Sequence, residues 1–276
     1  MTPPAVTLNT GARMPTLGLG TWQVPDSDTE TVVKTALTTG YRSIDTATSY
    51  RNERGVGTGL RACGLPREDV FVTTKLWNAD HGTDEARRAF DQSLERLGLE
   101  WVDLYLIHWP LPMRGRYVET WKALEGLHAE GRARAIGVSN FTAEHLRRLM
   151  AECDVVPAVN QVELHPLFAQ RELRAFHAEH GIVTQAWSPL GSGQGLLDLP
   201  ELTALARRRG LSTAQVVLRW HLQSGHAVIP RSADPAHLAQ NAEVFGFTLD
   251  DAEMAAVDSL DTGLRRGPDP DTFDYG

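Results

Sequence analysis

Short apolar runs alternate with amphipathic stretches along almost the whole chain. Eight of these runs have the length and composition of β-strands. Several are nearly all apolar, which is typical of parallel strands buried on both faces. The predicted strands are Leu17–Gly20, Ser43–Asp45, Val70–Thr74, Asp103–Ile107, Ala133–Val138, Ala158–Glu163, Ile182–Ala186 and Ala227–Ile229.

The stretches between the strands place apolar residues on one face of a helix. In Asp84–Leu97, for example, Ala86, Phe90 and Leu94 recur every fourth residue. Alternating strands and helices indicate an α/β fold, either an open doubly wound sheet or a closed barrel. The count of eight strands favours a (β/α)8 TIM barrel. The predicted helices are Thr29–Thr39, Asp84–Leu97, Val118–Glu130, Ala143–Met150, Gln170–His180, Leu202–Arg209 and Thr213–Ser224.

Both ends of the chain lie outside this alternation. Val6–Leu17 contains Asn9-Thr10-Gly11 and predicts an N-terminal β-hairpin. Asp250–Ser259 predicts an extra C-terminal helix with an acidic N-cap, and the tail after Asp261, rich in Gly, Pro and Asp, predicts an extended loop. No composition break divides the chain, so we expect residues 1–276 to form a single barrel domain.

Composition and charge narrow the class of protein. The net charge of −8 argues against nucleic acid or an anionic membrane as a partner. No apolar stretch is long enough to span a bilayer, and the start Met1-Thr2-Pro3-Pro4 lacks a secretory signal. Cys63 and Cys153 show no metal-like spacing and indicate free thiols in a reducing compartment. We therefore expect a cytoplasmic monomer without a bound metal.

Four reactive side chains lie at or just beyond the ends of successive predicted strands. Asp45 ends the second strand and Tyr50 follows it, while Lys75 and His108 stand at the ends of the third and fourth strands. In barrels of this kind the active site forms at the carboxyl ends of the strands. A carboxylate, a phenol, an ammonium and an imidazole are therefore expected at one mouth.

These four groups suit the reduction of a carbonyl group. A ketone or aldehyde that accepts hydride develops negative charge on oxygen and needs a proton. The Tyr50 phenol is a weak acid, with an ordinary pKa near ~10. A cation such as Lys75 lowers that pKa, and Asp45 can keep Lys75 charged and oriented. His108 can donate a hydrogen bond to the substrate oxygen.

Motifs along nearly the whole chain, in family order, resemble those of the aldo-keto reductases. The chain also resembles the smaller bacterial members of that family, including 2,5-diketo-D-gluconate reductases. The matching segments are Gly40-Tyr41-Arg42-Ser43-Ile44-Asp45-Thr46-Ala47 with Tyr50, Glu53 and Gly57, then Phe71–Trp77, Leu106–Pro110, Ile136–Phe141, Asn160–Glu163, Ala186–Leu190 and Ile229–Ser232.

The resemblance implies the (β/α)8 fold, NADPH as cofactor with NADH possible, and the catalytic tetrad Asp45, Tyr50, Lys75 and His108. It also implies a cofactor site in which Trp187 stacks on the nicotinamide. Ser139, Asn140 and Gln161 would hold the carboxamide, and a loop of small residues would bind the pyrophosphate. The remaining implied cofactor residues are Thr21, Trp22, Ser188, Leu190, Gly191, Ser192, Gln194, Arg231, Ser232, His237, Gln240 and Asn241.

Two glycine patterns, Gly18-Leu19-Gly20 and Gly55–Gly59, hint at a dinucleotide fingerprint of another kind. Neither completes that motif with a following strand and acidic residue. We interpret both as tight turns near the ends of strands and helices.

The predicted substrate pocket is aromatic. Trp22, Trp77 and Trp109 match positions that line the family's cleft, beside Tyr50 and His108. Three indoles make an apolar, rigid wall. The loop from Leu111 to Tyr117 and the tail are short, as in the small bacterial members. We therefore expect an open site for aldehydes, α-dicarbonyls and keto acids or esters.

Other functions fit single features of this sequence less well than reduction does. A Schiff-base aldolase would use Lys75 as a nucleophile, but Asp45 keeps that lysine charged; borohydride trapping with substrate would reveal it. A metal hydrolase is disfavoured because His108 and His165 lack paired ligand spacing. A nucleotide-binding sensor or a structural barrel without turnover remains the main alternative.

The adenosine end of the predicted cofactor site departs from the family pattern. Relatives place an Arg where this chain has His237, whereas Arg231 keeps a positive charge nearby. NADPH is expected to be preferred over NADH, but by a narrower margin than in typical relatives. His237→Arg should widen the ratio of kcat/KM for NADPH to that for NADH. A wild-type ratio near or below one would refute the preference. An unchanged ratio in the variant would place His237 away from the 2′-phosphate.

Overall fold

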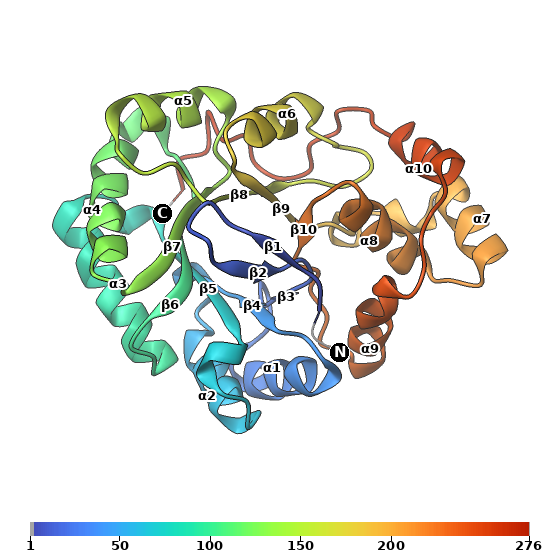
Figure 1. Cartoon of the computed structure of the whole chain (residues 1–276), viewed down its shortest axis with the longest axis horizontal. Helices are drawn as coiled ribbons and strands as arrows, with labels where there is room; N and C mark the ends of the chain where they lie inside the picture. Colours follow the sequence, from blue (N-terminus) through green and yellow to red (C-terminus); the bar gives the residue numbers. More distant parts are fainter. Residues whose placement is uncertain (1–2, 276) are drawn as a thin grey trace.

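The computed structural model describes residues 3–275, and its centre is a sheet of eight parallel strands in sequence order. The first and last strands are joined by a bridge between Leu17 and Val228, and Gly20 donates its backbone N–H to the Pro230 carbonyl at 3.1 Å. The sheet therefore closes into a barrel, which confirms the predicted fold (Figure 1). The strands are β3 (Leu19–Gly20), β4 (Ser43–Asp45), β5 (Phe71–Leu76), β6 (Val102–Ile107), β7 (Ala133–Ser139), β8 (Val159–Glu163), β9 (Val183–Trp187) and β10 (Ala227–Val228).

Helices surround the barrel and bury their apolar faces against it (Figure 1). Fourteen of the fifteen residues of the third helix fall within the predicted helix Asp84–Leu97, and its Ala86, Phe90 and Leu97 are fully buried. The helices are α1 (Asp26–Thr39), α2 (Glu53–Ala62), α3 (Thr83–Leu97), α4 (Tyr117–Ala129), α5 (Ala143–Glu152), α6 (Arg171–Glu179), α7 (Pro200–Arg209), α8 (Thr213–Gln223), α9 (Pro235–Ala242) and α10 (Asp251–Asp258).

The predicted N-terminal hairpin is present and plugs one end of the barrel. It consists of β1 (Ala5–Thr7) and β2 (Arg13–Pro15), which pair antiparallel. Leu8 and Met14 belong to an apolar cluster with residues that point into the barrel, such as Leu104 and Val159. The hairpin crosses the middle of the barrel in Figure 1. It thereby seals the amino ends of the strands and leaves the carboxyl ends for a ligand.

The segment Gly55–Gly59, interpreted above as a turn, is instead part of helix α2. Its glycines allow close helix packing: a Cβ on Gly55 would lie 2.7 Å from the Asp26 carbonyl oxygen, and one on Gly57 would lie 2.1 Å from that of Leu97. Glycine has a low helix propensity, so the local pattern favours a turn, but tertiary packing overrides it. Leu19 and Gly20 likewise form strand β3, which closes the barrel, and a Cβ on Gly20 would lie 2.7 Å from the Ile229 carbonyl oxygen.

Other differences from the predicted elements are small. Helix α9 was not predicted; it begins at Pro235, after Asp234 accepts a hydrogen bond from the Ala236 amide as the N-cap. Strand β5 continues to Leu76, so Lys75 lies within the strand and not at its end. The tail after Asp261 contains neither helix nor strand, as expected. Among residues 3–275, no helix combines the length and apolarity needed to cross a membrane.

Substitution of Gly57 tests the packing of α2. Gly57→Ala should lower the free energy of unfolding by about 1–3 kcal/mol, because the new methyl group meets a backbone oxygen that cannot move away cheaply. Gly126→Ala is the matched control, since Gly126 is also helical and its Cβ would meet only the mobile end of Arg87. The control should be neutral or slightly stabilising. Equal shifts of the urea midpoint in both variants would contradict this account.

Candidate active site

A cleft of about 750 Å³ opens at the carboxyl ends of the barrel strands. All five residues expected to contact substrate line it, which places the predicted aromatic wall and the reactive groups at one mouth. Three of the four predicted catalytic residues also line it, and the fourth, Lys75, lies directly beneath them with no exposed surface. The predicted substrate residues that line the cleft are Trp22, Tyr50, Trp77, His108 and Trp109.

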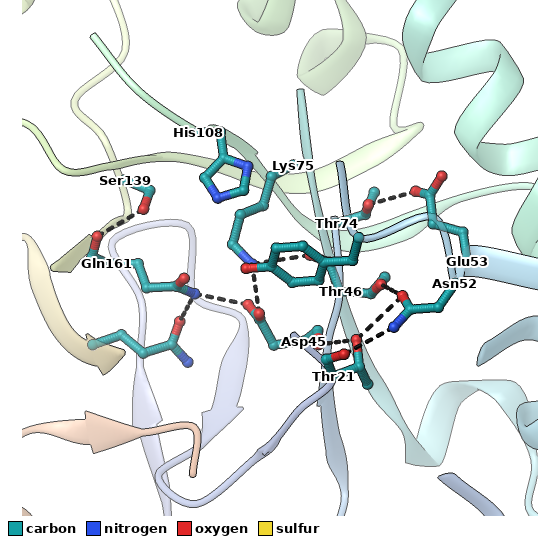
Figure 2. A network of polar contacts seen from close by, with 12 residues as sticks. Thr21, Asp45, Thr46, Asn52, Glu53, Thr74, Lys75, His108, Ser139 and Gln161 are labelled. Atoms are coloured by element: carbon teal, nitrogen blue, oxygen red, sulfur yellow. Dashed lines mark hydrogen bonds and ion pairs between the residues drawn. The ribbon is translucent and has the colours of Figure 1, made fainter. Parts of the chain in front are cut away.

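A buried ion pair lies under the floor of the cleft. The Lys75 ammonium donates to Asp45 Oδ1 at 2.5 Å, to the Thr46 carbonyl at 2.9 Å and to the Tyr50 hydroxyl at 3.3 Å (Figure 2). Each of its three N–H groups thus has one acceptor. Lys75 is fully buried and Asp45 is 1% exposed, so both charges depend on each other for stabilisation.

Burial and this ion pair together set the protonation states. Burial lowers the pKa of Lys75, but Asp45 and Tyr50 outweigh burial and raise the net pKa, so the ammonium stays charged. Burial raises the pKa of the Tyr50 phenol above its usual value, although Lys75 acts in the opposite direction. Lys75 thus has the predicted lowering effect on the Tyr50 pKa, but the effect of burial is larger. The phenol stays protonated at neutral pH, as a proton donor must.

His108 lies beside the phenol as a neutral ring. Its ring meets Tyr50 edge-on at a centroid distance of 5.7 Å and Trp77 at 5.2 Å. Burial, with Lys75 nearby, holds the pKa of His108 well below its usual value. Nδ1 is buried without a hydrogen-bond partner among the described residues, so Nε2 is the nitrogen available to the cleft. A neutral imidazole can donate one hydrogen bond there.

A chain of amides crosses the barrel to the Asp45 carboxylate. Gln161 of β8 donates from Nε2 to Asp45 Oδ2 at 2.7 Å and to Gln185 Oε1 of β9 at 2.8 Å (Figure 2). Both N–H groups of the Gln161 amide are thus used. Its Oε1 is left to accept a hydrogen bond, and Gln161 lines the cleft. The hydrogen bond to Asp45 gives Gln161 a structural role, because it orients the Asp45 carboxylate. Its predicted role in cofactor binding stays a prediction.

Asn140 and Ser139 lie in the same polar wall. Asn140 Nδ2 donates to the His108 carbonyl at 3.0 Å, and Asn140 Oδ1 accepts from Trp187 Nε1 at 2.8 Å. Ser139 Oγ donates to the Gln161 carbonyl at 2.8 Å. Asn140 has a left-handed backbone, with φ of 63°, held by these contacts. The orientation of Trp187 is therefore fixed through Asn140.

Two buried residues that were not predicted as site residues hold the loop that contains Tyr50. Asn52 Nδ2 donates to the Thr21 carbonyl at 2.8 Å, and its Oδ1 accepts from the Thr46 hydroxyl at 2.8 Å. Glu53 accepts from the Thr74 hydroxyl at 2.6 Å (Figure 2). It also accepts from Arg96 Nε at 2.6 Å. Glu53 belongs to the first family motif described above. The hydrogen-bond partners of Asn52 and Glu53, however, lie up to 43 positions away in the sequence. Local sequence therefore gives little sign of this support.

The cleft extends from Trp187 over the loop of residues 188–194. Ser188 and Ser192 have left-handed φ values of 48° and 52°, and a Cβ on Gly193 would meet nothing within 4 Å. Small side chains thus leave backbone groups open to a phosphate. Of the predicted cofactor residues, those that line the cleft are Trp22, Ser139, Asn140, Gln161, Trp187, Ser188, Leu190, Gly191, Ser192, Gln194 and Arg231.

The remaining predicted cofactor residues do not line this cleft. Thr21 is fully buried and donates to the Asp45 carbonyl at 3.0 Å, so it supports the site from below. The His237 side chain is 68% exposed and lies 3.7 Å from the Asp234 carboxylate. Asn241 is 4% exposed. Ser232 and Gln240 are partly exposed outside the lining. Their role at the adenosine end stays a prediction.

The C-terminal tail contributes residues to the cleft that were not predicted. Phe273 packs against Trp109 with ring centroids 4.3 Å apart and extends the aromatic wall. Arg266 and Gly267 line the cleft near Trp187, and both donate backbone N–H groups to Glu163. Within residues 3–275, no three metal-ligating side chains converge.

Comparison with known proteins identifies relatives over the full length. A model described as the Aldo/keto reductase family matches residues 16–262. Morphine 6-dehydrogenase of Pseudomonas putida is 50% identical, covering 98% of this chain and 96% of that protein. Methylglyoxal reductase DkgA of Escherichia coli (strain K12) is 48% identical, with 98% of each covered. A solved structure of a Gox0644 mutant in complex with NADPH has a TM-score of 0.95 at 47% identity, covering 100% of both chains.

Removing one charge tests the dependence of the buried pair on both partners. Asp45→Asn should lower the free energy of unfolding by about 3–5 kcal/mol, because it leaves a buried ammonium unpaired. Adding Lys75→Met should restore much of that loss, since the double variant buries no charge. Urea denaturation of the wild type, both single variants and the double variant measures the coupling. A double variant no more stable than Asp45→Asn would refute mutual dependence.

Proposed function

This chain belongs to the aldo/keto reductase family, and we propose that it reduces small aldehydes and ketones to alcohols with Tyr50 as the proton donor. Its cofactor is NADPH, which supplies the hydride when bound. The observation that supports Tyr50 most strongly is the 3.3 Å contact of its hydroxyl with a buried, charged Lys75 at the floor of the cleft. A phenol in contact with a permanent cation can lose a proton that an isolated buried phenol would retain.

Each member of the tetrad has a distinct part in the proton transfer. Tyr50 gives its proton to the substrate oxygen, and Lys75 stabilises the resulting phenolate by Coulomb attraction. Asp45 keeps Lys75 charged and in place. His108, neutral because of burial, donates from Nε2 to the substrate oxygen and sets its position beside the phenol. The proton and the hydride thus reach opposite atoms of one carbonyl bond.

The residues of the cleft fit the proposed cofactor. Trp187 offers a ring whose tilt is fixed by Asn140, which suits stacking on a nicotinamide. Gln161 Oε1 is free to accept from a carboxamide, because its own N–H groups are used within the barrel. The open loop of residues 188–194 suits a pyrophosphate, and Arg231 adds positive charge. Ser232, His237, Gln240 and Asn241 are proposed for the adenosine end on family resemblance.

The substrate class follows from the wall of the cleft. Trp77, Trp109 and Phe273 give apolar surface, whereas Trp22 is 47% exposed and leaves one side open. Similar chains are named for reactions with molecules as different as methylglyoxal and morphine. These features support a permissive site for aldehydes, α-dicarbonyls and keto acids or esters. The net charge of −8 supports a small-molecule partner over nucleic acid, and we propose a cytoplasmic monomer.

Tyr50→Phe is the direct test of the proton donor. With a panel of a simple aldehyde, an α-dicarbonyl and a keto ester, kcat should fall roughly 10²–10⁴-fold for each substrate. Binding of NADPH should be little changed, because only the hydroxyl is lost. Tyr105→Phe is the matched control: Tyr105 is fully buried outside the cleft, and its hydroxyl has no partner among residues 3–275. NADPH oxidation at 340 nm measures the rates.

Two outcomes would redirect the assignment. Near-normal rates in Tyr50→Phe would remove Tyr50 as the acid. A wild-type protein that binds NADPH but oxidises it with no member of the panel would support the nucleotide-sensor alternative. A single strongly favoured substrate would count against permissiveness while leaving the reduction itself intact.

A further inference from the structure

The buried carboxylate of Glu163 holds the C-terminal tail across the cleft. Glu163 ends strand β8 and is 1% exposed. Its Oε1 accepts from the Arg266 amide at 2.7 Å and its Oε2 from the Gly267 amide at 2.8 Å, while His165 Nε2 lies 3.0 Å from Oε1. Burial raises the pKa of Glu163, but these hydrogen bonds outweigh burial and lower it. A carboxylate at this point therefore fixes two successive residues of the tail.

The fixed backbone directs the Arg266 side chain onto the loop of residues 188–194. Arg266 Nη1 donates to the Gly191 carbonyl at 2.7 Å. The fit is tight on both sides: a Cβ on Gly191 would lie 2.7 Å from Arg266 Nη1, and a Cβ on Gly267 would lie 2.5 Å from Trp187 Cη2. The guanidinium therefore lies against the open loop, and the backbone of the next residue, Gly267, lies against the Trp187 ring.

Arg266 is one of two arginines in the cleft, and the carboxylates of the cleft have other partners. Two carboxylates line the cleft in the described part of the chain. Asp45 is paired with Lys75, and Glu163 accepts hydrogen bonds from backbone amides and lies beside His165. The permanent positive charges are Arg231 and Arg266. Nε and Nη2 form one planar edge of the Arg266 guanidinium, and no hydrogen bond within residues 3–275 uses either of them. Because Arg266 lines the cleft, this planar fork is available to a ligand there. Such a fork matches the oxygens of a phosphate.

We propose that Arg266 binds the pyrophosphate of the nicotinamide cofactor, and that Glu163 is the positioning residue that presents it by fixing the tail backbone. This inference rests on the proposed function, because it takes a pyridine nucleotide as the ligand of the cleft. The pyrophosphate would lie between the loop amides and the guanidinium, so the C-terminal tail forms one side of the cofactor site. Cofactor binding and tail attachment then stabilise each other.

Equilibrium binding of both nucleotides tests Arg266. Quenching of tryptophan fluorescence on titration with NADPH or NADH gives Kd without any turnover. Arg266→Ala should raise Kd for both nucleotides by a similar factor of roughly 10–100, because both contain the pyrophosphate. Arg266→Lys should recover part of the loss, since it keeps the charge but not the fork. Arg265→Ala is the matched control, because the Arg265 guanidinium packs over the Phe168 ring, 4.7 Å from its centroid.

Three results would overturn the assignment of Arg266. Unchanged Kd values in Arg266→Ala would remove it from the cofactor site. A loss confined to NADPH would assign Arg266 to the 2′-phosphate and not to the pyrophosphate. Unchanged nucleotide Kd values with a raised KM for keto acids alone would make it a substrate residue. None of these results alters wild-type carbonyl reduction, so the inference can fail while the proposed function stands.

A double-mutant cycle tests Glu163. Glu163→Gln keeps the shape of the side chain but loses the carboxylate that accepts from two amides, so Kd for both nucleotides should rise. If Glu163 acts through Arg266, adding Arg266→Ala to Glu163→Gln should weaken binding little further. Fully additive effects would show that Glu163 does not position Arg266. A uniform fall in stability from a merely structural role would not produce this non-additivity in Kd.

Discussion

The Lys75–Asp45 ion pair is the interaction on which the rest of the site depends. It is a costly feature, because two charges are removed from water and neither can be lost alone. The barrel offsets this cost by bringing partners for the Asp45 carboxylate from several strands. Asp45 comes from β4 and Lys75 from the neighbouring β5, while Gln161 reaches Asp45 from β8, four strands away across the interior. Only a closed barrel brings these strands around one carboxylate. The hydroxyl of Tyr50, the proposed proton donor, then accepts a hydrogen bond from the Lys75 ammonium at 3.3 Å.

Backbone strain is concentrated at the same end of the barrel. Within residues 3–275, all the non-glycine residues with left-handed φ lie in loops that follow strands. Such conformations cost of order 1–3 kcal/mol each and persist where surrounding contacts determine them. Asn140 illustrates this, since its side chain is held by His108, Ser139 and Trp187. The strained residues are Gln23, Arg51, Leu111, Asn140, Gln170, Ser188 and Ser192.

The two carboxylates that line the cleft, Asp45 and Glu163, are stabilised by different kinds of partner. Asp45 is paired with a side-chain cation, which keeps Lys75 ionised for the chemistry. Glu163 is bound mainly by backbone amides, so its charge is stabilised without using a lysine or arginine. Arg266 therefore stays available to a ligand although its own backbone is fixed. In this way a segment without helix or strand becomes an ordered wall of the cleft.

Hydrophobic periodicity determined most of the architecture, because eight buried strands and their helices each leave a local pattern. Position along those strands also determined that Asp45, Lys75, His108 and Tyr50 would converge. Tertiary structure decided the features that depend on residues far apart in the sequence. The glycines of α2 suggest a turn locally, yet they permit close packing against α1 and α3. Burial, which no local pattern measures, outweighs the lowering effect of Lys75 on the Tyr50 pKa. Glu163 and Arg266 are separated by 103 positions, and only folding places that carboxylate under the tail.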